Sequence, residues 1–136
     1  MSHPAGLPDL FLDRSLGRIQ VPRLLRAAGL RLVTLAEHYG TPADERVKDV
    51  SWLQLAGQRD WAVLMKDRGI RFNVAEREAA RRYAVRCFCI TRQNLTAQEM
   101  ADRFLHNLTA MEAACIQPGP FIYAVDERRP RRLPLK

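Results

Sequence analysis

Three aspartates, Asp13, Asp49 and Asp67, stand where a parallel β-sheet would bring them together. Asp13 directly follows the apolar run Leu10–Leu12, and Asp67 comes two residues after Met65, so both mark the ends of predicted strands. Asp49 opens the helix predicted before the second of these strands. Ligands gather at the carboxyl edge of an open parallel sheet. Three carboxylates in one partly dry pocket repel each other, which favours a hard divalent cation, Mg²⁺ or Mn²⁺ rather than zinc.

Each of these aspartates also has a purely structural interpretation. Asp49 could cap its own helix, since Asp is among the preferred N-cap residues. Asp13 could cap the helix after the first strand, or form a turn with Ser15. The shared position at one sheet edge favours the functional interpretation, because turn aspartates need not converge.

The elements that must position these residues alternate between strand and helix. The spacing of apolar residues predicts strands over residues 10–12, 30–35, 61–65, 85–90 and 121–125, and helices over 16–28, 49–57, 74–84 and 96–115. Thr96 and Glu99 have the spacing of a capping box at the start of the last helix. Residues 37–48 form the longest predicted loop. This alternation predicts an α/β/α sandwich of three layers around a mainly parallel sheet of about four to five strands.

Length and composition limit the classes of protein that fit. The chain has 136 residues, which suits a single domain, expected over residues 1–125, followed by a basic, Pro-containing tail over 126–136. No apolar run approaches the roughly 18 to 20 residues that span a bilayer, and the start lacks a signal-peptide pattern, so we expect a cytoplasmic protein. Three cysteines without an export signal are expected to be reduced and buried rather than disulfide-bonded or zinc-bound.

The formal net charge of +7 favours a polyanionic partner, above all nucleic acid. The cations beside the aspartates in sequence, expected to bind RNA phosphates, are Arg14, Lys66, Arg68 and Arg71. Arg14 could instead pair with an aspartate and hold it in place. The basic tail is either a solvated extension without stable structure or a contact for RNA or a partner protein.

Four motifs in this order resemble the pattern of PIN-like domains, which include the toxin ribonucleases of VapC-type toxin–antitoxin systems. They are Phe11-Leu12-Asp13-Arg14-Ser15-Leu16-Gly17, Asp49-Val50-Ser51-Trp52-Leu53, Trp61-Ala62-Val63-Leu64-Met65-Lys66-Asp67-Arg68 and Thr91-x-x-Asn94-Leu95-Thr96. The resemblance implies a metal-dependent endoribonuclease in which Asp13, Asp49 and Asp67 bind Mg²⁺ or Mn²⁺. It also implies a cognate antitoxin as protein partner and a possible homodimer.

The sequence departs from the family pattern in two places. Asn94 stands where many members have Asp, and Ser51 falls where Glu is expected, so the usual fourth acid is not placed. Glu37 and Glu45, in the predicted loop, are candidates to complete the set, although each also fits an ordinary solvated carboxylate.

Three alternatives remain open at this stage. The missing fourth acid suggests a PIN-like module that binds RNA or a protein without cleaving. A phosphoacceptor receiver domain would use Asp13, Asp67 and Thr91, but the acidic pair before its first helix and the lysine after its fifth strand are missing. Metal-free catalysis by His38 lacks a second catalytic histidine, because His3 lies in the loose start and His106 on a long helix.

Overall fold

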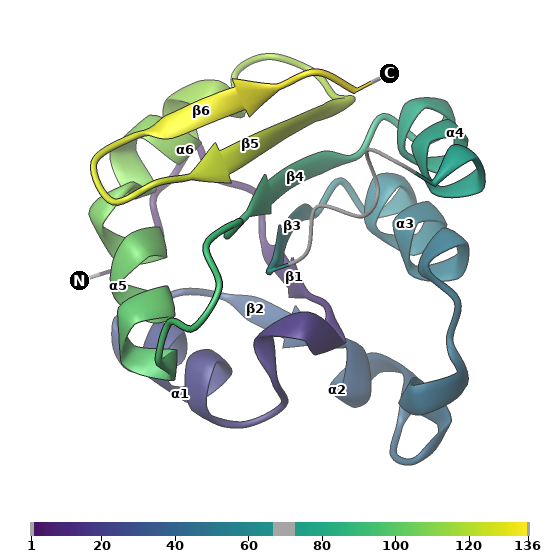
Figure 1. The fold of residues 1–136 in the computed structure, drawn as a ribbon, viewed down its shortest axis with the longest axis horizontal. Coiled ribbons are helices and arrows are strands. Elements are labelled where there is room, and N and C mark those ends of the chain that lie inside the picture. The colour runs from purple at the N-terminus through teal and green to yellow at the C-terminus, as the bar shows by residue number, and fades with distance from the viewer. Residues whose placement is uncertain (1, 67–72, 136) are drawn as a thin grey trace.

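The computed structural model describes residues 2–66 and 73–135. Within them, six strands form one sheet in the order β2-β1-β3-β4-β5-β6 (Figure 1). The first five strands run parallel to their neighbours, and β6 pairs antiparallel with β5. The strands are β1 Leu10–Leu12, β2 Leu32–Thr34, β3 Ala62–Met65, β4 Arg86–Cys89, β5 Phe121–Val125 and β6 Pro130–Leu133. The predicted α/β fold with a mainly parallel sheet is therefore confirmed, with one strand more than expected.

Helices cover both faces of the sheet. They are α1 Gln20–Ala27, α2 Leu35–Tyr39, α3 Asp49–Gln58, α4 Val74–Arg82, α5 Ala97–His106 and α6 Leu108–Ala114, with short 3-10 helices η1 Arg14–Leu16 and η2 Ala43–Arg46. Helices α1, α5 and α6 contribute to one buried apolar cluster, and α2, α3 and α4 to the other. The sheet lies between the two clusters, which gives the three predicted layers.

The alternation of side chains along the strands explains the two clusters. Leu10 and Leu12 of β1 belong to the cluster under α1 and α5, whereas Phe11 between them belongs to the cluster under α3. All three are completely buried. Because both faces of a parallel sheet are covered, its strands are continuous apolar runs, which is the pattern that the sequence shows.

The connection predicted as a loop over residues 37–48 contains helical structure. Helix α2 starts at a capping box: Thr34 accepts a hydrogen bond from the Glu37 backbone N–H, and the Glu37 side chain accepts one from the Thr34 N–H. The 3-10 helix η2 follows. Both segments are too short and too polar to give a recognisable apolar period, which is why the prediction of a loop was wrong there.

The long helix predicted over residues 96–115 is two helices. It begins at the expected capping box of Thr96 and Glu99, but α5 ends at His106 and α6 begins at Leu108. Between them the buried Asn107 donates its amide to the carbonyls of Arg103, at 2.7 Å, and Asp126, at 3.0 Å. A side chain that bonds to nearby backbone in this way competes with helix continuation.

The basic tail is not a solvated extension along its whole length. Residues 130–133 form β6, with Leu133 buried opposite Ile122 of β5. Arg131 pairs with Asp126 across the turn, with 3.1 Å between Nε and Oδ2. Figure 1 shows β6 beside β5 at the end of the sheet. The interpretation of this segment as lacking stable structure is therefore wrong, because the backbone of β5 offers it a pairing edge.

The start of the chain is also fixed rather than loose. His3 is buried, and its Nε2 donates to the carbonyls of Leu7, at 2.9 Å, and Pro8, at 3.1 Å. Its Nδ1 accepts a 3.0 Å hydrogen bond from the Arg31 backbone N–H, just before β2. Among the described residues, no helix is long and apolar enough to cross a bilayer.

Candidate active site

Asp13 lies at the carboxyl end of β1, the strand between β2 and β3 in the sheet. Its backbone N–H donates to the carbonyl of Leu64 in β3 at 3.4 Å. Its side chain caps η1, where Oδ1 accepts hydrogen bonds from the backbone N–H, at 3.1 Å, and the hydroxyl of Ser15. The predicted capping turn with Ser15 is therefore present, and the described hydrogen bonds use one of the two carboxylate oxygens.

Asp13 is 7% exposed, and no described cation forms an ion pair with it, a rare arrangement for an acid so far removed from water. Burial raises its pKa from 3.8 to about 6, against the opposing effect of the hydrogen bonds from Ser15. The charge of Asp49 raises the pKa further, and that of Arg14 lowers it. Two of the predicted site acids therefore lie close enough to repel each other.

Asp49 is the first residue of α3, and Lys48 is the N-cap residue without a side-chain hydrogen bond. The interpretation of Asp49 as the N-cap is thus wrong. Its Oδ1 accepts a 2.8 Å hydrogen bond from the indole Nε1 of Trp52, a completely buried side chain of the same helix. This contact orients the half-buried carboxylate at the start of the helix.

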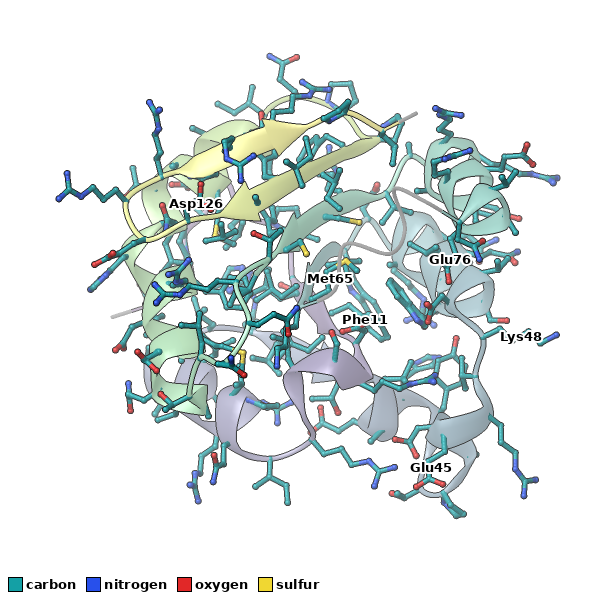
Figure 2. All side chains as sticks on the ribbon, in the orientation of Figure 1. Phe11, Glu45, Lys48, Met65, Glu76 and Asp126 are labelled. Carbon is teal, nitrogen blue, oxygen red and sulfur yellow. The ribbon has the colours of Figure 1, made fainter. Side chains whose placement is uncertain are left out.

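Ser15 ties the end of β1 to the end of β3. Its hydroxyl donates to Asp13 and accepts a 2.9 Å hydrogen bond from the Lys66 backbone N–H. Lys66, a predicted phosphate-binding residue, therefore follows β3 at the same edge of the sheet as Asp13. In Figure 2 the labelled Phe11 and Met65, from β1 and β3, lie together at the centre of the fold.

Asp67, the third predicted acid, and the predicted phosphate-binding residues Arg68 and Arg71 lie outside the described residues. Within residues 2–66 and 73–135, no three His, Cys, Asp or Glu side chains form a group that could hold a metal ion. The two described acids fit a hard cation in kind: both supply carboxylate oxygens, they repel each other, and Asp13 has an oxygen outside its bonds to Ser15.

The three supporting candidates have other surroundings. Glu37 forms the α2 capping box and accepts two hydrogen bonds from Arg26, at 2.6 and 2.8 Å, which lower its pKa. Glu45 is exposed and lies 3.3 Å from Nη2 of Arg18. Asn94 is exposed, with a left-handed backbone φ of 64°, in the connection between β4 and α5. The ion pairs of both glutamates show that each has a structural partner.

A groove beside Asp49 carries basic side chains that the sequence analysis did not single out. It is lined by residues of η1, η2, the segment before α3 and the start of α4. Its charged residues are three cations and three acids: Arg14, Arg46 and Lys48, and Glu45, Asp49 and Glu76. Figure 2 shows Glu45 and Lys48 on this outer side of the fold. Arg46 and Lys48 had no sequence signal of their own, because they lie in the segment predicted as a loop.

Arg14 and Arg18 both reach the connection between α2 and α3. Arg14 donates from Nη2 to the Val47 carbonyl and forms no ion pair with an aspartate of the described residues. Arg18 donates from Nε and Nη2 to both oxygens of Asp44, at 2.9 and 2.8 Å. Asp44 is 2% exposed, and sequence reasoning missed it, because a buried acid in a polar loop leaves no periodic pattern.

The exposed His38 contacts the rings of Tyr39 and Trp61 edge-on, at centroid distances of 4.8 and 6.2 Å. These contacts are aromatic and add no support for histidine catalysis.

Comparison with known proteins identifies the family of the chain. The profile of the "PIN like domain" family matches residues 8–92. The chain is 42% identical over 121 residues to a Mycobacterium tuberculosis protein named "Putative ribonuclease VapC45", an alignment that covers 89% of this chain and 88% of that protein. No solved structure matches the chain significantly. The match across all of β1 to β4 and the identity to this relative show that the chain belongs to the PIN-like domain family.

Proposed function

We propose that this protein is an endoribonuclease dependent on Mg²⁺ or Mn²⁺ and the toxin of a VapBC-type toxin–antitoxin pair. Asp13, Asp49 and Asp67 would hold the ion, and Arg14, Lys66, Arg68 and Arg71 would bind RNA phosphates. The observation that carries the proposal is the juxtaposition of Asp13 and Asp49 at the carboxyl edge of the sheet, with the buried Asp13 carboxylate at a pKa of about 6.

The residues around the pair have separable tasks in this proposal. A bound divalent ion supplies a water of lowered pKa and neutralises charge on the phosphate. Ser15 fixes the Asp13 carboxylate, and the indole of Trp52 fixes that of Asp49. Burial makes the Asp13 carboxylate costly as a free anion, as its raised pKa shows, and a bound cation would offset that cost.

The charged side chains near the site and the family of the chain support RNA as the substrate and an antitoxin as the partner. The groove beside Asp49 offers Arg46 and Lys48 as further cations for a phosphate backbone, next to the acids Glu45 and Glu76. The name of the 42% identical relative supports a ribonuclease activity. The cognate antitoxin and a homodimer belong to the same proposal, and a pull-down from the native host tests the antitoxin.

Cleavage of labelled single-stranded and tRNA-like RNAs tests the activity. Wild type, Asp13→Asn and Asp67→Asn are prepared identically and compared with Mn²⁺, with Mg²⁺ and with EDTA. We expect a metal-dependent cut that each substitution lowers at least about 100-fold. The matched control is Asp9→Asn, an exposed acid at the amino end of β1 that pairs with Arg31, and it should cut as wild type does.

Equal cleavage by wild type and Asp13→Asn would reject this site. If folded, Mn²⁺-binding protein cuts none of the RNAs yet retains them, the non-cleaving PIN-like module becomes the better interpretation. The absence of both Mn²⁺ binding and RNA binding would reject the proposal as a whole.

A further inference from the structure

Two arginines after Asp13 hold the connection between α2 and α3 in place. Arg14 donates to the carbonyl of Val47, and Arg18 forms a two-pronged ion pair with Asp44. Arg18 comes five residues after Asp13, and Asp44 five residues before Asp49. The Arg18–Asp44 pair therefore joins the two chain segments that carry the candidate acids.

The pair is built in a way that resists opening. Asp44 is 2% exposed, and a buried carboxylate is costly unless it is paired. The planar guanidinium of Arg18 meets both oxygens, an arrangement that fixes direction as well as distance. The Asp44 backbone N–H also donates to the Gly40 carbonyl at 2.8 Å. Moving the connection outward would leave a buried charge without its partner.

The start of α3 depends on this connection. Its N-cap, Lys48, makes no side-chain capping bond, so the first turn lacks the usual local support. The buried anchors of the helix, Trp52 and Leu53, come one turn later. Asp49 therefore stands between a firmly packed helix body and a connection held by Arg18.

We propose that Arg18 and Asp44 are positioning residues that set the separation between the Asp13 and Asp49 carboxylates. The inference rests on the proposed function, because that separation matters for a metal ion held between the two segments. Neither residue needs to touch the ion or the RNA. Their effect reaches the site through the backbone from Asp44 to Asp49.

The test uses Arg18→Gln, Arg18→Lys and Asp44→Asn, with Arg31→Gln as the control. Arg31 also pairs with an aspartate, Asp9, at 2.7 Å, but before β1 at the opposite edge of the sheet. Two readouts are taken on the full chain: the indole ¹H–¹⁵N signals without metal, and Mn²⁺ affinity by calorimetry. The chain has two tryptophans, and Trp52 is the one whose indole donates to Asp49.

We expect the Trp52 indole signal to shift in Arg18→Gln and Asp44→Asn, because its acceptor Asp49 moves, and to stay in place in the control Arg31→Gln. Mn²⁺ affinity should fall about 10- to 100-fold, the usual effect of losing a group that orients a ligand. The Mn²⁺ affinity of Arg18→Lys should lie between those of wild type and Arg18→Gln, since an ammonium keeps the charge but not the two-pronged contact. It also supplies a folded comparison if Arg18→Gln does not fold.

Unchanged Trp52 signals in folded Arg18 and Asp44 variants would overturn the inference, and so would Mn²⁺ affinities equal to that of Arg31→Gln. The two proposals are distinguishable if the Trp52 signal shifts in the Arg18 and Asp44 variants but the wild-type protein binds no Mn²⁺. In that case the positioning role stands and the metal-dependent function fails.

Discussion

His3 and Asp13 are two buried polar side chains at opposite ends of β1, and their surroundings differ. Both ring nitrogens of His3 are hydrogen-bonded to backbone groups, which tie residues 3–8 to the start of β2. Asp13 is buried to a similar degree, but its described hydrogen bonds come from Ser15 alone and its charged neighbours include Asp49.

The difference indicates that His3 stabilises the folded state, whereas the ionised Asp13 carboxylate destabilises it. Buried polar groups in stable proteins are normally satisfied by hydrogen bonds, as His3 is. A buried carboxylate whose pKa has risen to about 6 is less stable as an anion than it would be in water. Substitutions at the two positions should therefore change stability in opposite directions.

The largest effect is expected for His3→Ala. The substitution leaves the Arg31 N–H and the carbonyls of Leu7 and Pro8 without their partner, which should lower the free energy of unfolding by about 3 kcal/mol. Urea denaturation measures it. His106→Ala, at an exposed position of α5, is the control, and equal losses in the two variants would show that the His3 contacts contribute nothing specific.

Binding of Mn²⁺ should offset the unfavourable free energy of the buried Asp13 carboxylate. At about 100 times its dissociation constant, the ion should add about 2.7 kcal/mol to the free energy of unfolding of wild type and of His3→Ala. Asp13→Asn should gain nothing, because a neutral amide is a weak ligand for a hard cation. Thermal unfolding with Mn²⁺ and with EDTA measures this. A gain in Asp13→Asn as large as in wild type would place the ion elsewhere.

Without metal, Asp13→Asn should be more stable than wild type by about 2 kcal/mol at pH 7.5. Asp13 binds its proton more tightly in the folded state, with a pKa of about 6 against an ordinary 3.8. The stability that protonated Asp13 contributes is thus fully present below pH 3.8 and lost as the pH rises through about 6. Urea denaturation in EDTA should show the advantage of the variant disappearing by pH 4, and an advantage that does not change with pH would contradict this account.

The smallest effect is expected for Arg31→Gln. The Arg31–Asp9 ion pair is exposed on both sides, at 62% and 47%, so its loss should change the free energy of unfolding by less than about 0.5 kcal/mol. The backbone N–H of residue 31 still donates to His3 in this variant. Urea denaturation of Arg31→Gln and His3→Ala side by side then separates the contribution of the buried ring from that of the surface pair. A loss of unfolding free energy in Arg31→Gln as large as that in His3→Ala would contradict this separation.

The layered fold could be predicted because its strands are buried on both faces. Runs such as Ala62–Met65 are continuously apolar, and the helices between them show apolar spacing and caps. Sequence patterns did not predict three other features: the short helices η2 and α2, the break at Asn107 and strand β6. The first two lack enough residues for a period, Asn107 acts through tertiary contacts, and β6 depends on pairing with β5.

The positions of Asp13 and Asp49 in the fold could be predicted because each adjoins a clear element, and their roles as ligands stay predictions. The neighbours that hold these two acids in place could not be predicted from the sequence. Arg18 and Asp44 meet through folding of a polar connection, and nothing in their sequence context distinguishes Asp44 from an ordinary solvated acid. Partners of this kind become visible in the folded geometry alone.

Strand β6 also covers an edge of the sheet that β5 would otherwise leave open. Without it, the apolar strand Phe121–Val125 would form an open edge of the sheet, and such edges recruit strands from other molecules. The covering strand brings Pro130, which cannot donate a backbone hydrogen bond, and the exposed Arg131 and Arg132. A chain shortened after Val125 should therefore lose solubility through intermolecular β-pairing of the exposed β5 edge.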